Sequence, residues 1–235
     1  LYAFNSIIDA DTGSTPFGLF VVSDGMGGHR NGEVAADVAV RTMGNYIVDK
    51  LHKPLVGYQA ESPEESFHEI MHTGVVKANQ AVVSQAPGGG CTMTAILIIG
   101  HKMTIAHVGD SRAYSIFPDG RMQTLTRDHS LVKRLEELGQ ITPEEAELHP
   151  QKSMLYRALG QGEQYEPDVT TATLPHPGYM LICSDGLWSV VAEDDIYQVV
   201  TSSVSPQRAC QDLVDLANAA GGPDNITVML IRMSE

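Results

Sequence analysis

Four aspartates stand where apolar stretches of the chain begin or end, and their surroundings suggest that they act together. The stretches leading to Asp24 and Asp185 both finish in Ser-Asp-Gly, and a third finishes in Gly-Asp at Asp110. Asp224 comes just before the apolar stretch that starts at Ile226. A rigid sheet can aim side chains at strand ends toward one point, and neighbouring glycines permit tight turns there.

Converging carboxylates predict a cation site. They repel one another unless a positive charge lies between them or they take up protons. Ligand sets made of oxygen suit hard cations such as Mg²⁺ or Mn²⁺, and no cluster of Cys or His ligands points to zinc. Two such ions roughly 3.5–4 Å apart can activate a water for in-line attack at phosphorus. A single Asp-Gly after a strand is usually a turn or helix cap, so the prediction depends on the repeated pattern.

The elements that position these aspartates are predicted to be buried strands, because short apolar runs recur between turn signals. The runs cover residues 18–23, 93–99, 103–108, 113–117, 179–183 and 226–232. Residues 92–126 resemble an antiparallel meander, with turns at residues 100–102 and 118–120.

Helix signals lie between these strands. Ser-Pro-Glu-Glu at 62–65 and Thr-Pro-Glu-Glu at 142–145 each supply a cap residue, a proline and a glutamate in capping-box order. Ser205-Pro206 predicts another helix, which ends at Gly221-Gly222. A long helix is predicted from Gly32 or Glu33 to about Lys50. Its apolar face is expected to contain Val34, Val38, Met43 and Ile47.

The order of these elements predicts an α+β fold. Strands and helix pairs follow one another without regular βαβ alternation, which favours antiparallel sheets flanked by helices. The polar, helix-rich stretch 127–164 interrupts the strands and is expected to form a flap. A chain of 235 residues suits one domain, and no apolar run approaches the roughly 18–20 residues that cross a bilayer.

Charge and cysteine content narrow the class of protein. The chain has 29 acidic and 15 basic residues, so its formal net charge is −14 and no basic footprint for nucleic acid is visible. The acidic excess either maintains solubility or forms part of a cation site. Cys91, Cys183 and Cys210 fit no zinc spacing, which predicts free thiols in a reducing, cytoplasmic compartment.

Six motifs in sequence order carry a resemblance to a known family. They are Asp-Gly-Met-Gly-Gly-His at 24–29, Gly-Cys-Thr-Met-Thr at 90–94, Gly-Asp-Ser-Arg at 109–112, Leu-Thr-Arg-Asp-His at 125–129, Ser-Asp-Gly at 184–186 and Pro-Asp-Asn-Ile-Thr at 223–227. In order and spacing they resemble the type 2C (PPM) protein phosphatases, over nearly the whole chain. Bacterial members share Met26, where the animal enzymes usually carry His, so the likeness is to the bacterial branch.

The resemblance implies both a fold and an activity. The fold is a four-layer α-β-β-α sandwich of two antiparallel sheets, forming one catalytic domain over residues 1–235 with the flap at 127–164. The activity is Mn²⁺- or Mg²⁺-dependent hydrolysis of phosphoserine and phosphothreonine in proteins, by direct attack of a water that bridges two ions.

The resemblance also implies roles for individual residues. Catalysis would depend on Asp24, Asp185 and Asp224. Asp24 would bridge both ions with the Gly25 carbonyl on the second, while Asp185 and Asp224 would hold the first. Asp110 would share a third, weaker ion with Asp185. Asn225 is expected to orient the Asp224 carboxylate.

Two functional residues stay open between alternatives. The proton for the leaving group would come either from a metal-bound water or from His29, although a His in a polar loop is more often structural. Arg112 is a candidate cation near the site, and pairing with a neighbouring carboxylate is an equal alternative for it. The flap is expected to select substrates, and Trp188 is expected to be core rather than recognition surface.

One family motif has no counterpart here. The family begins with Arg-x-x-Asn-x-Asp/Glu, whose Arg binds phosphate, and nothing before Asp24 matches it. We expect that segment to precede Leu1. The fragment would then bind the second metal poorly and turn over slowly.

Two functions follow as hypotheses. The first is an active, monomeric phosphatase that acts on phosphoproteins and opposes a Ser/Thr kinase. The second is a pseudophosphatase, a regulatory domain that binds phosphoproteins without hydrolysis. Intact acids at all four strand ends favour the first, because a binding module has no need of them.

Overall fold

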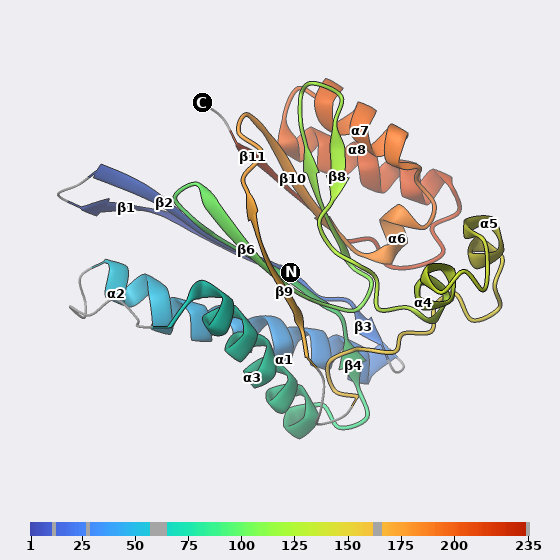
Figure 1. The fold of residues 1–235 in the computed structure, drawn as a ribbon, viewed down its shortest axis with the longest axis horizontal. Coiled ribbons are helices and arrows are strands. Elements are labelled where there is room, and N and C mark those ends of the chain that lie inside the picture. The colour runs from blue at the N-terminus through green and yellow to red at the C-terminus, as the bar shows by residue number, and fades with distance from the viewer. Residues whose placement is uncertain (11–12, 27–28, 57–64, 162–165, 234–235) are drawn as a thin grey trace.

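The strands form two stacked antiparallel sheets in a computed structural model that describes residues 1–10, 13–26, 29–56, 65–161 and 166–233 (Figure 1). The first sheet has the strand order β1-β2-β5-β6-β9 and the second has the order β11-β10-β7-β8. In the first sheet the strands are β1 (Tyr2–Ala10), β2 (Gly13–Val22), β5 (Met93–Ile99), β6 (Lys102–Val108) and β9 (Asp168–Thr173). In the second they are β7 (Arg112–Ile116), β8 (Met122–Thr124), β10 (Gly178–Cys183) and β11 (Val228–Met233). A short pair, β3 (Gly25–Met26) and β4 (Gly90–Cys91), lies apart from both.

Helices cover the outer faces of both sheets, which gives the predicted α-β-β-α order (Figure 1). The first sheet is covered by α1 (His29–Ile47) and α3 (Phe67–Gln85), and the second by α7 (Glu193–Ser202) and α8 (Pro206–Ala219). Three short helices complete this part of the fold: the π-helix η1 (Val48–His52), α2 (Lys53–Leu55) and α6 (Asp185–Trp188). No helix in the described ranges is long and apolar enough to cross a membrane.

The alternation of β5 shows how the layers are built. Met93, Ala95 and Leu97 point into the core shared with α1 and α3, while Ile96 and Ile98 point into the core between the sheets. Successive side chains of a strand face opposite sides, so a strand in a middle layer is apolar at nearly every position. The continuous apolar runs of the sequence are thus those of strands buried on both faces.

The predicted meander at 92–126 is wrong in one respect. Strands β5 and β6 pair with each other, but β7 and β8 belong to the other sheet. The chain crosses between sheets at residues 109–111. Gly109 has φ +107°, a conformation that L side chains rarely adopt, and this turn redirects the chain.

The predicted long helix exists, but its buried face differs from the expectation. Helix α1 begins at His29 and ends at Ile47, before the π-helical turn. Met43 and Ile47 are fully buried as expected, whereas Val34 is 40% exposed. Ala35 and Ala39 occupy the buried face one position along, where small side chains allow close packing against the sheet.

Two of the three predicted helix caps are present in the structure. The Thr142 capping box with Glu145 is present at the start of α5 (Pro143–Glu147), and Ser205 caps α8 as predicted. Residues 62–64 of the other predicted cap lie outside the described residues. Helix α3 is capped instead by Ser66, whose side chain forms a capping box with Glu69.

The stretch 127–164 contains α4 (Leu131–Glu137) and α5, which lie outside the two sheets and their flanking helices (Figure 1). Exposed apolar side chains gather in it: Leu138, Leu148, Met154 and Tyr156. We call residues 127–164 the flap from here on.

Candidate metal centre

Asp24 follows β2, and main-chain hydrogen bonds fix its position. Its amide donates to Thr92 Oγ1 at 3.0 Å, and the Thr92 amide donates to the Asp24 carbonyl at 2.8 Å. The Ser23 hydroxyl adds a 2.6 Å bond to the Thr92 carbonyl. The next residue, Gly25, packs so closely on α1 that a Cβ there would lie 2.3 Å from the Gly32 oxygen. Only glycine fits at Gly25.

Asp110 lies in the crossing between β6 and β7 and is 8% exposed. The Trp188 Nε1 donates to its main-chain oxygen at 2.9 Å. Its neighbour Ser111 is fully buried and forms a 2.7 Å hydrogen bond with Thr92 Oγ1. Thr92 therefore contacts both the Asp24 and the Asp110 segments.

Asp185 and Asp224 lie at the same end of the second sheet, because β10 and β11 are antiparallel neighbours. Asp185 follows β10 as the first residue of α6. Ser184 ties the two segments together, since its Oγ donates to the Asn225 carbonyl at 3.2 Å and accepts from the Thr227 amide at 3.0 Å. Asp224 is exposed, and its Oδ1 accepts a 2.7 Å bond from the Asn225 main-chain amide. This contact uses the main chain of Asn225, so a role of its side chain in orienting Asp224 stays a prediction.

The carboxylates interact with one another. Burial, then the charge of Asp185 and a hydrogen bond with its carboxylate, raise the pKa of Asp24 to about 7, and Asp224 adds to the effect. Burial and then the charge of Asp224 also raise the pKa of Asp185. Burial, Asp185, Asp128 and Asp24 raise the pKa of Asp110 to about 8. Asp24 and Asp185 therefore interact with each other, with Asp224 and with Asp110 at one end of the sandwich.

This arrangement of carboxyl groups fits a hard cation, although the described side chains do not form a complete coordination site. Oδ1 of Asp185 is buried without a hydrogen-bond partner, and a buried polar atom of this kind is costly unless something binds it. Carboxyl oxygens with raised proton affinity suit Mg²⁺ or Mn²⁺. Within the described ranges, no three His, Cys, Asp or Glu side chains already lie in an arrangement that would hold a metal ion. The acids meet as interacting neighbours.

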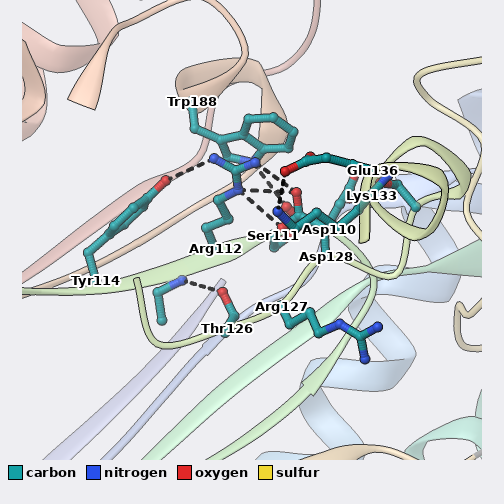
Figure 2. Close-up of polar contacts among 12 residues, drawn as sticks. Asp110, Ser111, Arg112, Tyr114, Thr126, Arg127, Asp128, Lys133, Glu136 and Trp188 are labelled. Atoms are coloured by element: carbon teal, nitrogen blue, oxygen red, sulfur yellow. Dashed lines mark hydrogen bonds and ion pairs between the residues drawn. The ribbon is translucent and has the colours of Figure 1, made fainter. Parts of the chain in front are cut away.

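Arg112 is paired with a carboxylate, which is one of the two alternatives (Figure 2). Its Nε and Nη2 bond to Asp128 at 2.8–3.2 Å, and the guanidinium carbon lies 3.6 Å from the centre of the Trp188 ring. Asp128 is the second residue of the flap, and Trp188 is the last residue of α6. Arg112 thus links β7, the flap and α6 around Asp110. Its Nε and Nη2 donors are engaged by Asp128.

His29 begins α1, and its side chain lies outside the described part of the structure. Met26 contacts the flap: Gln161 Nε2 lies 3.2 Å from its sulfur.

The sequence predicts the acids but not the buried polar side chains that bond to the segments carrying them. Thr92, Ser111, Ser184 and His129 are buried polar side chains that bond to the acid-bearing segments. Trp188 packs against the core as expected and also bonds to Asp110. The available signal was a polar residue inside or beside an apolar strand, which needs a partner when buried.

Comparison with known proteins gives a consistent result. The profile described as protein phosphatase 2C matches residues 3–226. Protein phosphatase PhpP of Streptococcus pneumoniae is 38% identical over 218 residues, which cover 92% of this chain and 86% of PhpP. Serine/threonine protein phosphatase PstP of Mycobacterium tuberculosis is 34% identical over 90% of this chain and 40% of PstP.

Solved structures share the fold. The Mycobacterium tuberculosis phosphatase PstP/Ppp superposes with a TM-score of 0.80 at 29% identity, covering 100% of this chain and 98% of that one. A PstP catalytic domain in complex with 2 manganese ions gives a TM-score of 0.75 at 28% identity, over 100% and 97% of the two chains. The Streptococcus agalactiae serine/threonine phosphatase gives 0.78 at 33% identity, over 97% and 91%.

Proposed function

Because this chain belongs to the protein phosphatase 2C family, we propose that Asp24, Asp110, Asp185 and Asp224 bind the divalent cations on which its catalysis depends. The family is one of metal-dependent serine/threonine protein phosphatases, and the chain is an enzyme of this kind. The observation that carries the assignment of the site is the buried Oδ1 of Asp185, which has no hydrogen-bond partner and belongs to a carboxyl group that interacts with that of Asp24.

The roles of the acids follow from where the chain holds them. Bound Mn²⁺ or Mg²⁺ would supply Lewis acidity and an activated water for in-line attack on a phosphate ester. Asp24 interacts with both Asp185 and Asp224, so it takes the central place, with the Gly25 carbonyl beside it. Asp185 and Asp224 complete the principal site from the second sheet. These three acids are the catalytic carboxylates.

Two ions are proposed for the principal site, with Mn²⁺ or Mg²⁺ as the metal. The likeness to the PstP domain with 2 manganese ions supports this number. Asp110 is proposed to share a third, weaker ion with Asp185, because the charge of Asp185 is the largest contribution to its pKa after burial. Asn225 and His29 are proposed as the group that orients Asp224 and as a candidate proton donor to the leaving group.

Phosphoserine and phosphothreonine in proteins are the proposed substrates, as the names of the relatives suggest. An opposing Ser/Thr kinase would generate them. The exposed apolar side chains of the flap support its role in substrate selection. We propose a cytoplasmic monomer; the free thiols of Cys91, Cys183 and Cys210 support a reducing compartment.

The direct test is metal-dependent hydrolysis. The protein is freed of metal with EDTA, dialysed, and assayed on p-nitrophenyl phosphate and on a phosphothreonine peptide with added Mn²⁺ or Mg²⁺. We expect hydrolysis of both compounds only with added cation. Equal rates with and without cation would contradict the assigned site, and binding of the peptide without hydrolysis would indicate a pseudophosphatase.

A further inference from the structure

His129 lies near the start of the flap and contacts the segment that carries Asp110. Its side chain is 0% exposed, and its ring packs between those of His107 and Tyr156, with ring centres 5.0 and 5.6 Å away. None of the roles assigned to the metal centre uses this side chain. Its hydrogen bonds nevertheless lead directly to that centre.

Two hydrogen bonds join His129 to Gly109, the residue before Asp110. The Gly109 amide donates to His129 Nδ1 at 3.1 Å, and the His129 amide donates to the Gly109 carbonyl at 2.8 Å. Gly109 packs closely on Thr92, because a Cβ on it would lie 2.6 Å from the Thr92 side chain. His129 therefore supplies the acceptor for a buried amide whose place in the fold is already tightly defined.

Asp168 determines which nitrogen of the ring carries the proton. Since Nδ1 accepts from Gly109, it is unprotonated, and the proton sits on Nε2, which donates to Asp168 Oδ2 at 3.1 Å. Asp168 is the first residue of β9, just beyond the flap. Arg157, within the flap, bonds to its other oxygen at 2.9 Å. Burial lowers the pKa of His129, in keeping with a neutral ring.

We propose that His129, near the start of the flap, is a positioning residue for Asp110: it bonds to Gly109, the residue before Asp110, and to Asp168 at the start of β9. The proposal rests on the proposed function, in which Asp110 binds a cation. His129 touches neither substrate nor cation in this role. It holds the main chain of Gly109 so that the Asp110 carboxylate points toward Asp185.

A matched pair of substitutions separates the two ring nitrogens. His129→Asn places an amide oxygen where Nδ1 was, so it retains an acceptor for Gly109. His129→Gln places an amide nitrogen where Nε2 was, so it retains the bond to Asp168 and leaves the Gly109 amide without an acceptor. Both variants lose the ring, and a difference between them reports the hydrogen bond to Gly109 rather than packing.

The first measurement needs no activity. Amide hydrogen exchange of Gly109 and Asp110 is followed in the metal-free protein by NMR. We expect faster exchange in His129→Gln and near wild-type exchange in His129→Asn. Equal exchange in the two variants would overturn the proposal. Asp168→Ala provides a second route should the ring substitutions fail to fold. Without Asp168, the proton of the His129 ring is no longer held on Nε2, so Nδ1 is less often free to accept from the Gly109 amide. Exchange of the Gly109 amide should therefore accelerate, and unchanged exchange would overturn the link through Asp168.

The second measurement is the Mn²⁺ concentration that half-saturates hydrolysis of p-nitrophenyl phosphate, with Mn²⁺ binding followed in parallel by calorimetry. Groups that orient metal ligands typically change affinity or activity by about 10–100-fold, and His129 acts one residue further away, so we expect a rise of about three- to tenfold in His129→Gln. The KM for p-nitrophenyl phosphate should stay constant, and His129→Asn should restore the wild-type value. A wild-type protein without hydrolysis would contradict the proposed function, while the exchange data would still decide the place of His129.

Discussion

The indole Nε1 of Trp188 donates a 2.9 Å hydrogen bond to the main-chain oxygen of Asp110. The bond joins two acid-bearing segments, since Trp188 lies three residues after Asp185 in the same short helix. The same indole ring lies against the Arg112 guanidinium (Figure 2). One side chain thus connects the segments of Asp110 and Asp185 at the proposed metal centre.

Trp188→Phe should weaken the protein and its catalysis together. Phenylalanine keeps a ring beside Arg112 but leaves the Asp110 carbonyl without this donor, which should lower the free energy of unfolding by about 1 kcal/mol. Urea unfolding checks the stability, and p-nitrophenyl phosphate hydrolysis at limiting Mn²⁺ checks the site. Tyr197→Phe is the control, because it removes a comparable 3.3 Å bond to the Phe117 carbonyl away from the acids. Equal activity in the two variants would mean that the bond serves stability alone.

Asp185→Asn should abolish metal-dependent hydrolysis and stabilise the metal-free protein. The substitution removes a charge that raises the pKa of Asp24 and of Asp110. Relief of repulsion worth about 1 kcal/mol would raise Tm by roughly 2–4 °C in a domain of this size, and the rise in Tm on adding Mn²⁺ should disappear. Thermal unfolding with EDTA and with Mn²⁺ measures both effects. Asp194→Asn removes an exposed acid in α7 and is the control, for which neither the Tm in EDTA nor its rise on adding Mn²⁺ should change. Full activity in Asp185→Asn would refute the assignment of this carboxylate.

Arg112→Ala should destabilise the fold more than the double variant with Asp128→Asn does. Asp128 is 7% exposed, and loss of its partner leaves a buried carboxylate unpaired. Breaking fully buried pairs costs about 3–5 kcal/mol; with Arg112 23% exposed, we expect about 2–3 kcal/mol. A double-mutant cycle in urea gives the coupling energy. Additive losses would show that the two side chains act independently.

His107 should make the protein less stable in acid. Burial, and then the neighbouring His129, lower the pKa of His107 to about 3 from an ordinary value of 6.5, so the folded state keeps it neutral while the unfolded chain takes up a proton below pH 6.5. Stability from this group is therefore present above pH 6.5 and lost as pH falls, by about 2 kcal/mol between pH 8 and pH 5.

The comparison with His107→Gln isolates this effect, because the carboxylates with raised pKa values contribute a pH dependence of opposite sign in both proteins. The free energies of unfolding of wild type and variant are measured at pH 8 and pH 5. Between pH 8 and pH 5, the wild type should lose about 2 kcal/mol of free energy of unfolding relative to His107→Gln. A difference that is independent of pH would show that His107 is not held neutral.

The sequence predicts those parts of the fold that depend on local patterns. The run at 93–99 is apolar because both faces of β5 are covered, and Thr142 caps its helix through atoms three residues away. The candidate acids were predicted for the same reason, since each sits near a strand end beside a glycine or a proline. Contacts between distant residues leave no such pattern. Trp188 and Asp110 are 78 residues apart in sequence, and Gly109 sends the chain into the other sheet with no change in the apolar pattern.

The apolar pattern of the sequence also did not predict correctly which face of α1 is buried. Val34 follows the periodicity of α1 yet is exposed, while Ala35 and Ala39 are buried in the core that α1 shares with the first sheet and α3. Which face is buried depends on how the helix packs on distant segments, and the pattern of one helix does not encode that.

Both sheets contribute acids to the proposed metal centre, and this has a mechanical consequence. Asp24 follows a strand of the first sheet and Asp110 lies in the crossing between the sheets, while Asp185 and Asp224 flank neighbouring strands of the second. A cation held by both pairs would cross-link the sandwich at one end. The sheets would then resist sliding past each other, so a loaded molecule stretched in an optical trap should yield at higher force than one kept in EDTA.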